Sequence, residues 1–453
     1  MKKNIPMLYF IAIVGQMFGT AIAGTYLSFY MTERLLLTAS AMGVILLVAR
    51  IVDLIIGFLS GMIVQKTSFK YGQYRSWLII GPICVAIGVI MCFLNPNISV
   101  QMKGVIVLLG YILYGGGMSF AQLGQNGMMS KIAGPNLDMR LTISGKIVQG
   151  QTVAQIATAL TIMPLIIWVE RFGVDGYTVV AILFSVISIA AQTTLFKGTK
   201  EYDQYDPDFK SKSGASGSVG SMIGDILKNK QILLVMLGDT LRFAAMMTII
   251  SLAMYYFTFV AGNPLLISVA MLSQSIAGFT GALFAPSIVK KIGKKNAAVT
   301  SGAIATLAYT GLALFAGANP ILYIVLNSAG FLGMSLVNSC GVNLYLDCAE
   351  YQLYKTGKDN KTFSMSMFGV AIKVGFAVTS ILVSWVLQTS GYDAATGMAE
   401  PARLARLIGA VPAVLYLVYM LIYMFFYKIT EEKSREYAAH NYEKAAAAQK
   451  ANN

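Results

Sequence analysis

The stretch VARIVDLIIGFLSGMIVQKTSFKYGQYRSW, residues 48–77, decides the fold of this chain. Its first half is an apolar helical segment that carries Arg50 and Asp53, and its second half turns into a basic hairpin. A membrane-spanning helix needs about 20 mostly apolar residues, and this segment supplies them. Because charges at membrane depth are costly, Arg50 and Asp53 become candidates for a functional site.

The composition of the whole chain agrees with an integral membrane protein. Of its 453 residues, 56% are hydrophobic and 12% are charged, and the mean hydropathy is +0.66. Soluble domains carry about 25% charged residues. The net charge is +14, but Lys and Arg lie between apolar runs and form no single patch, so nucleic acid is not an expected partner. The expected partner is the lipid bilayer.

The length criterion predicts twelve spans, six on each side of a polar linker. They are expected at 7–31, 41–63, 77–94, 104–128, 146–168, 177–196, 231–260, 265–288, 298–317, 321–346, 364–388 and 405–427. The expected fold class is therefore an all-α membrane protein. Its predicted parts are an N-terminal six-helix bundle at 1–196, a cytoplasmic linker at 197–230, a C-terminal bundle at 231–428 and a cytoplasmic tail at 429–453. We also expect a short amphipathic helix at 223–227 and a helix in the tail.

The distribution of Lys and Arg predicts how the chain is oriented in the membrane. Few basic residues follow the odd-numbered spans, namely Arg34, Lys103, Arg171, Arg403 and Arg406. Most of the others lie in the two termini, the linker and the loops after the even-numbered spans. Both termini are therefore expected in the cytoplasm, with the chain spanning the cell membrane several times.

The two halves of the sequence repeat one feature, a basic hairpin with a glycine after the second span. The first copy contains Lys70, Gly72 and Arg75, and the second contains Gly293 and Lys294. Two six-helix halves with this repeat predict the major facilitator fold, two pseudo-symmetric bundles with a binding site near the midplane of the bilayer.

Arg50 and Asp53 are three residues apart, so they share one helix face and can pair. Burial favours the neutral form of the carboxyl group, whereas the nearby guanidinium favours the charged form. This competition suits a carboxylate that binds and releases a coupling cation. The alternative is a static pair that only fixes helix packing.

Polar residues in the fourth and first spans are candidates for binding a solute. Gln122, Gln125 and Asn126 are expected to form one polar stripe that hydrogen-bonds hydroxyl groups, with interhelical bonding as the alternative. Tyr26 has a ring that could stack on a sugar, although tyrosines at membrane interfaces are common.

Two isolated lysines and one further charged pair complete the candidates. Lys373 lies mid-span with no acidic residue within a turn, so its partner is expected from another helix, a solute or water. Lys146 lies near a span end, where it could instead reach the interface. Asp239 and Arg242 are again three apart, and either a gate that opens during transport or a structural anchor fits them.

No motif in the chain supports catalysis or a bound cofactor. The four cysteines lack metal-ligand spacing, and neither a phosphate-binding loop nor a nucleophile elbow is present. An enzyme, a metal site and ATP-driven transport are therefore not expected.

The chain resembles the glycoside-pentoside-hexuronide:cation symporter family, the melibiose permease group of the major facilitator superfamily. Three segments carry the resemblance, RIVDLIIGFLSGMIVQKTSFKYGQYRSW at 50–77, AMYYFTFVAG at 253–262 and DCAEYQLYKTGKDNKTFSMSMFGVAIKVG at 347–375. The likeness extends over nearly all of residues 7–427, and the third segment is the most specific.

The resemblance implies roles for individual residues. Asp53 matches the first of two aspartates that bind the coupling cation, Lys373 matches a lysine implicated in coupling, and Lys146 falls where an arginine contacts sugar. Departures are equally informative, because the second aspartate is Gly57 and the asparagine before it is Ile56. The family's sugar-binding acidic residue on the first helix falls at about Met17. The sugar-binding aspartate and tryptophan on the fourth helix correspond to Gln122 and Asn126, so melibiose is a poor candidate.

The leading hypothesis is a symporter for a sugar or glycoside that works by alternating access as a monomer. A proton is favoured over sodium, because one carboxylate remains and sodium prefers several oxygen ligands. An anionic solute such as a uronide is expected because cations outnumber carboxylates among the candidate cavity residues, which are Arg50, Lys146, Arg242 and Lys373 against Asp53 and Asp239. Alternatives are a carrier of a lipid or amphipathic drug with the same fold, and a membrane sensor that transports nothing.

Overall fold

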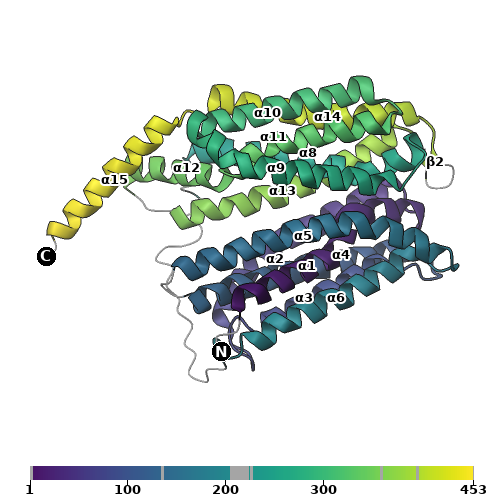
Figure 1. Ribbon diagram of the computed structural model, residues 1–453, viewed down its shortest axis with the longest axis horizontal. Helices are drawn as coiled ribbons and strands as arrows, with labels where there is room; N and C mark the ends of the chain where they lie inside the picture. Colours follow the sequence, from purple (N-terminus) through teal and green to yellow (C-terminus); the bar gives the residue numbers. More distant parts are fainter. Residues whose placement is uncertain are drawn as a thin grey trace. The chain divides into compact units, whose positions relative to one another are not determined.

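Helices make up almost all of the computed structural model, which describes residues 4–133, 137–204, 224, 228–357, 361–393 and 397–451. The first six helices match the six spans expected for the N-terminal half. They are α1 Ile5–Glu33, α2 Ala39–Lys66, α3 Trp77–Cys92, α4 Val100–Ala133, α5 Leu137–Glu170 and α6 Gly176–Gly198. In Figure 1 these helices, purple to teal, run side by side as one bundle.

The second half begins with α8, and three of its helices end in a π-helical turn. Its elements are α8 Lys230–Tyr255 with η1 Tyr256–Val260, α9 Leu266–Ile292, α10 Lys294–Gly311 with η2 Leu312–Ala316, α11 Pro320–Asn338, α12 Gly341–Thr356, α13 Lys361–Thr389, β1 Tyr392–Asp393, β2 Gly397–Met398, α14 Pro401–Leu421 with η3 Ile422–Phe426, and α15 Glu431–Ala451. The two short strands pair antiparallel as a small hairpin.

Eleven helical segments of the described chain are long and apolar enough to cross a bilayer. Helix α3 is apolar but has only 16 residues, a length of about 24 Å at 1.5 Å per residue. It occupies the position of the third expected span. The tenth expected span is longer than predicted, because α12 continues α11 after a break at residues 339–340.

The structured residues form two compact units, and these units do not coincide with the predicted domain boundaries. Unit 1 contains Met1–Ser213, Ile250–Ser275 and Ser380–Leu404, and unit 2 contains Gly214–Ile249, Ile276–Thr379 and Ala405–Asn453. The ends of α8, α9 and α13 thus group with the first six helices.

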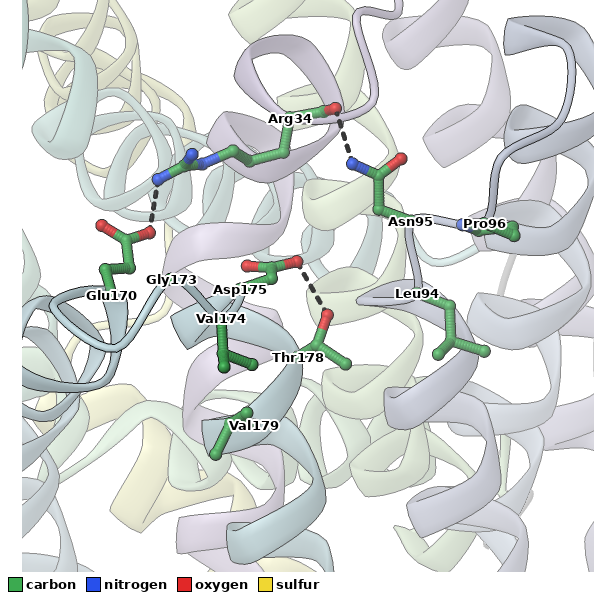
Figure 2. Close-up of a pocket in the computed structure, with 10 residues that line it drawn as sticks. All are labelled: Arg34, Leu94, Asn95, Pro96, Glu170, Gly173, Val174, Asp175, Thr178 and Val179. Atoms are coloured by element: carbon green, nitrogen blue, oxygen red, sulfur yellow. Dashed lines mark hydrogen bonds and ion pairs between the residues drawn. The ribbon is translucent and has the colours of Figure 1, made fainter.

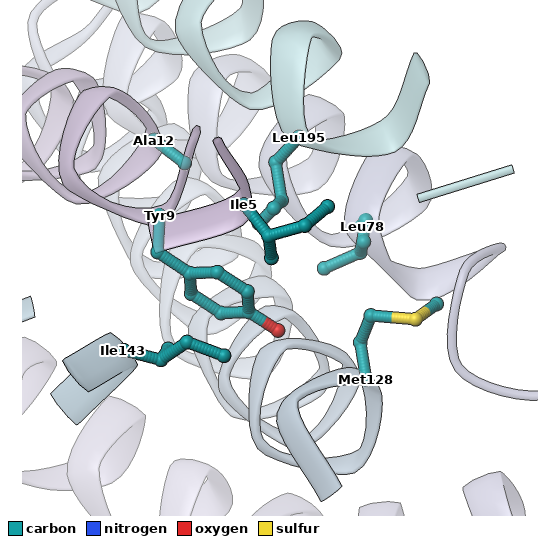
Figure 3. Packing of buried hydrophobic residues seen from close by; sticks show 7 residues of the cluster. All are labelled: Ile5, Tyr9, Ala12, Leu78, Met128, Ile143 and Leu195. Atoms are coloured by element: carbon teal, nitrogen blue, oxygen red, sulfur yellow. The ribbon is translucent and has the colours of Figure 1, made fainter. Parts of the chain in front are cut away.

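One hydrophobic core cluster of unit 1 draws its side chains from α1, α3, α4, α5 and α6. Seven buried side chains converge there, as Figure 3 shows, and they are Ile5, Tyr9, Ala12, Leu78, Met128, Ile143 and Leu195. Close helix approach depends on glycine. A Cβ on Gly88 of α3 would lie 2.5 Å from the carbonyl oxygen of Gly110 on α4, so any larger residue would push these two helices apart.

Both predicted basic hairpins are present, each turning at a glycine with positive φ. Gly72 has φ of +105° and Gly293 has φ of +81°, values that side-chain-bearing residues rarely adopt. We call the end of unit 1 that carries residues 67–76 its hairpin end. The end with the loops at 34–38, 93–99 and 171–175 is its loop end.

The tail forms the expected helix, α15, which packs against α12 in unit 2. Ser434 donates a hydrogen bond to Asp347 over 2.7 Å, and the Asn441 amide donates to Glu350 Oε2 over 2.7 Å. The helix expected at 223–227 lies outside the described residues, apart from residue 224.

Candidate functional site

Helix α2 places Asp53 in the interior of unit 1. The helix starts at Thr38, whose hydroxyl accepts a hydrogen bond from the Ala41 amide, and its apolar residues carry it through the bilayer thickness. Asp53 is 7% exposed. It faces Gly115 of α4, where a Cβ would lie only 2.8 Å from Asp53 Oδ1. The missing side chain of Gly115 therefore leaves the space that the Asp53 carboxyl group fills.

Arg50, one turn before Asp53, faces the same helix. Its guanidinium carbon lies 4.8 Å from the ring centroid of Tyr111, a cation–π contact. Both Arg50 and Asp53 interact electrostatically with Tyr111 and Tyr114 of α4. The spacing of three residues thus places the cation and the carboxyl group on one helix face, as predicted, and both face α4.

The glutamine and asparagine side chains of α4 do not form the single stripe expected. Gln122 and Asn126 are exposed, whereas Gln125 is 5% exposed. The Gln125 amide donates to Gln16 Oε1 over 2.7 Å and also reaches Gln192 Oε1 at 3.4 Å. At about 100° per residue, positions 122 and 126 nearly coincide, but position 125 lies to one side and meets α1 and α6. Gln125 therefore joins three helices, the interhelical alternative.

The expected stacking face of Tyr26 is covered in this structure. Tyr26 is fully buried in unit 1, with its hydroxyl 3.9 Å from Met271 Sδ and its ring edge against Tyr177. The sequence showed which face of α1 carries Tyr26 but not that other side chains cover this face.

The two lysines are both half-buried and lie in different units. Lys146 of α5 donates to the side chain of Gln149, one turn further along the same helix, over 2.9 Å. Lys373 lies in the middle of α13 in unit 2, two residues from Gly375, which packs against Thr240 and Phe243 of α8.

Asp239 and Arg242 form the predicted pair on α8. Arg242 Nη2 lies 3.0 Å from Asp239 Oδ1, and the two side chains are 0% and 1% exposed. Tyr345 of α12 donates to Asp239 Oδ2 over 3.0 Å, and Arg242 donates to Asn338 of α11. These contacts all lie within unit 2. The pair is a buried, multiply hydrogen-bonded feature, and its role as a gate stays a prediction.

A set of contacts at the loop end of unit 1 was missed by the sequence. Its members, here named the seal, are Ser28, Thr32, Glu33, Tyr255, Ser384 and Tyr392. Tyr255 donates to the Ser28 carbonyl over 2.8 Å, and its hydroxyl lies 2.7 Å from that of Thr32. Ser384 donates to the Ala39 carbonyl over 2.8 Å. Segments more than 200 positions apart in the sequence are thereby joined.

Tyr392 of the strand hairpin completes the seal. Its hydroxyl donates to Glu33, and its ring packs edge-on against Tyr255 at 5.6 Å. Burial, followed by the bond to Glu33, raises the pKa of Tyr392 well above its ordinary value. The hydroxyl therefore stays protonated and remains a donor to Glu33 at physiological pH.

Asp203 holds the hairpin end of unit 1 by hydrogen bonds, and the sequence analysis did not predict this role. The backbone amides of Tyr74 and Arg75 donate to its Oδ2 over 2.7 and 2.8 Å, and Lys131 lies 2.6 Å from its Oδ1. A side chain on Gly72 would collide with this carboxylate. The acidic stretch of the linker contained the signal, but the sequence did not show which of its carboxylates meets the hairpin.

A cavity of about 760 Å³ lies at the loop end of unit 1, shown in Figure 2. Arg34 and Glu170 form an ion pair across it, and Asp175 accepts a bond from Thr178. None of the predicted site residues lines it. The cavity therefore does not coincide with Asp53 or with the other candidates.

Residues 8–431 match the family described as MFS/sugar transport protein. The chain belongs to this family. A transporter of the MFS sugar transport family is a multi-pass membrane protein and not an enzyme, in agreement with both expectations. The resemblance to the glycoside-pentoside-hexuronide:cation symporters is thereby confirmed.

Similar proteins and solved structures cover most of the chain. An uncharacterized symporter of Bacillus subtilis, YjmB, is 26% identical over 90% of this chain and 88% of its own. A protein of Salmonella typhimurium assigned as a sulfoquinovose importer is 23% identical over 90% and 86%. The isoprimeverose transporter of Lactiplantibacillus pentosus is 23% identical over 86% and 80%. A crystal structure of a D-xylose-proton symporter shares the fold, with a TM-score of 0.61 and 14% identity over 91% of this chain and 96% of that one.

Proposed function

We propose that this protein is a proton-coupled symporter that carries an acidic sugar or glycoside across the cell membrane by alternating access. The observation that carries the proposal is the buried carboxyl group of Asp53, held against Gly115 with Arg50 one turn away. Charged residues are costly inside a membrane, so those found there commonly belong to the pathway of a substrate or an ion.

The choice of a proton rests on which oxygen atoms are available around Asp53. Sodium is a hard cation and binds several oxygen ligands, whereas a proton needs a single carboxylate. Ile56 and Gly57, on the next turn of α2, carry no side-chain oxygen. Tyr111 and Tyr114 supply only phenol groups nearby. This set suits protonation of Asp53 better than a metal-ion cage.

An acidic solute is favoured by the balance of charges. Asp239 and Arg242 neutralise each other inside unit 2, so we remove both from the balance. The remaining candidates are three cations, Arg50, Lys146 and Lys373, against the single carboxyl group of Asp53. A net positive set in a partly dry environment attracts anions. The relative assigned as a sulfoquinovose importer is named for a solute with a sulfonate group, which supports the same class.

Within unit 1 we assign solute contacts to the exposed Gln122 and Asn126 and to Lys146. Lys373 of unit 2 is carried forward as the solute contact that the sequence predicts. Amide groups can hydrogen-bond sugar hydroxyls, and lysines can bind a carboxylate as point charges. Gln125 and Tyr26 are omitted from this set because both are buried in contacts between helices.

Transport by alternating access requires the seal of unit 1 to open once in each cycle. The cytoplasmic termini and the monomeric state are carried forward as parts of the proposal.

Competition for uptake in proteoliposomes tests the solute class. Methyl glucuronide and the matched neutral methyl glucoside are offered together with a labelled glucuronide. We expect only the acidic sugar to compete strongly. Lys373→Gln should weaken binding of the glucuronide by about tenfold or more, since loss of a charge-assisted bond costs about 1.5–3 kcal/mol.

Lys103→Gln is the matched control for charge removal, because Lys103 bonds Asn95 near the loop end, away from Asp53. Equal competition by the neutral sugar would contradict the charge argument.

A further inference from the structure

Helix α14 and its continuation η3 carry a column of buried tyrosines in unit 2. Tyr416, Tyr419 and Tyr423 are spaced three or four apart and share one helix face, and Tyr427 follows directly after the end of η3. All four are at most 1% exposed. Successive ring centroids lie 6.4, 4.9 and 5.4 Å apart, so the rings form a continuous series.

The neighbouring helices lack side chains where these rings pack. A Cβ on Gly238 of α8 would lie 2.9 Å from Tyr423 Cε2, and one on Gly302 of α10 would lie 3.0 Å from Tyr419 Cδ1. Tyr309 of α10 stacks on Tyr416 with centroids 5.6 Å apart. Gly238 directly precedes Asp239, so the column lies beside the buried ion pair of α8. The tyrosines are thus held in a close-fitting space between helices.

The hydroxyl groups of Tyr309, Tyr419 and Tyr423 make no hydrogen bond with the described side chains and backbone, and all three residues are 0% exposed. The hydroxyl of Ser301 on α10, next to Gly302, is also buried and makes no hydrogen bond with the described residues. Tyr419 and Tyr423 also interact electrostatically with both members of the pair formed by Asp239 and Arg242.

The energetic cost of such hydroxyls is high. A buried polar group without a partner loses its bonds to water and gains none in return, and this loss is large relative to the small net stability of a folded protein. Lipid tails offer no hydrogen bonds, so the surrounding bilayer cannot supply the missing partners. Buried water commonly satisfies polar groups of this kind, with two to four bonds each.

We propose that unit 2 holds an internal chain of bound water molecules along Tyr309, Tyr419 and Tyr423, which ends at the pair of Asp239 and Arg242. Each phenol donates to or accepts from a water molecule, and the last molecules in the chain hydrate the guanidinium. Taking two charges out of water costs several kcal/mol per ion, and local hydration offsets part of this cost. The water chain therefore keeps the ion pair charged within the bilayer.

Radiolytic hydroxyl-radical labelling read by mass spectrometry tests the proposal on the full chain in lipid nanodiscs. Radicals form from water, so a buried side chain is oxidised when water is bound beside it. Tyr419 and Tyr423 should be oxidised severalfold faster than Tyr255 and Tyr9. Those two tyrosines are matched controls, because they are equally buried but have hydroxyls bonded to protein groups. Equal, low rates at all four would overturn the proposal.

A second variant distinguishes bound water from transient opening between the helices as the source of the radicals. Tyr423→Phe removes one hydroxyl and leaves the ring that fills the space beside Gly238. If water forms a connected chain, oxidation of Tyr419 should fall in this variant while its circular dichroism spectrum stays that of the parent. Unchanged oxidation of Tyr419 would mean that radicals reach the ring by another route, and the proposal would fail.

Discussion

At the scale of single residues, the space beside Asp53 is the feature most open to test. Gly115→Ala places a Cβ 2.8 Å from Asp53 Oδ1, closer than atoms can approach, so the carboxyl group must move. Overpacking of this kind costs about 1–3 kcal/mol. We expect proton-driven accumulation of solute to fall by roughly tenfold or more, since about 1.4 kcal/mol corresponds to a tenfold change. Uptake into proteoliposomes under an imposed pH gradient measures it.

The neighbouring glycine provides the control. A Cβ on Gly116 would lie 3.4 Å from Ile56 Cγ2, an ordinary contact, so Gly116→Ala should transport normally. Equal activity of both variants would show that the position of Asp53 does not matter for coupling.

The sequence predicted some residue contacts and could not predict others. A spacing of three residues correctly predicted the pair of Asp239 and Arg242 and the shared face of Arg50 and Asp53. Spacing alone did not reveal that Gln125 would meet Gln16, because a helix position says nothing of the neighbour that covers it. Tyr26 illustrates the same limit.

At the scale of elements, the seal depends on hydrogen bonds between α1 and the end of α8. Tyr255→Phe removes the hydroxyl that bonds Thr32 and the Ser28 carbonyl. Two bonds of about 0.5–1.5 kcal/mol each are lost, which should open the loop end more often. We expect a cysteine placed at the buried Ser28, which keeps the backbone carbonyl that accepts from Tyr255, to react faster with a membrane-impermeant thiol reagent. Tyr26→Phe is the control, since its hydroxyl makes only a long contact with Met271.

No change in the reactivity of this cysteine, or the same change in both variants, would show that Tyr255 does not hold the seal closed. These contacts could not be predicted from the sequence, because the segments that form them are separated by more than 200 residues. The apolar pattern of each segment predicts a helix, but it does not predict which other helix lies beside it.

The hairpin end offers a second prediction for an element. Asp203→Ala leaves two backbone amides and Lys131 without their carboxylate. Bonds to a charged group contribute about 1.5–3 kcal/mol, so the apparent melting temperature should fall. Thermal unfolding in detergent measures the effect, and Glu201→Ala, an exposed neighbour, should leave the midpoint unchanged. Equal midpoints for the two variants would mean that Asp203 does not stabilise the hairpin.

At the scale of the whole molecule, hydropathy predicted the class and most helix positions. A bilayer demands long apolar helices because backbone groups must be bonded internally, and this constraint is visible in any membrane sequence. The short α3 and the extension of the tenth span into α12 were less predictable, since length alone does not locate a helix end. The ends of α8 and α13 that carry Tyr255 and Ser384 group with unit 1, and the predicted division into two halves stays a prediction.

The measurement that tests the central claim most directly is accumulation of a labelled glucuronide in proteoliposomes, with proton and sodium gradients imposed separately. The account predicts that a proton gradient alone drives accumulation. It also predicts that Asp53→Asn abolishes this accumulation while solute exchange across the membrane continues. Accumulation driven by sodium, or normal accumulation by Asp53→Asn, would contradict the assignment of Asp53 as the proton-coupling residue.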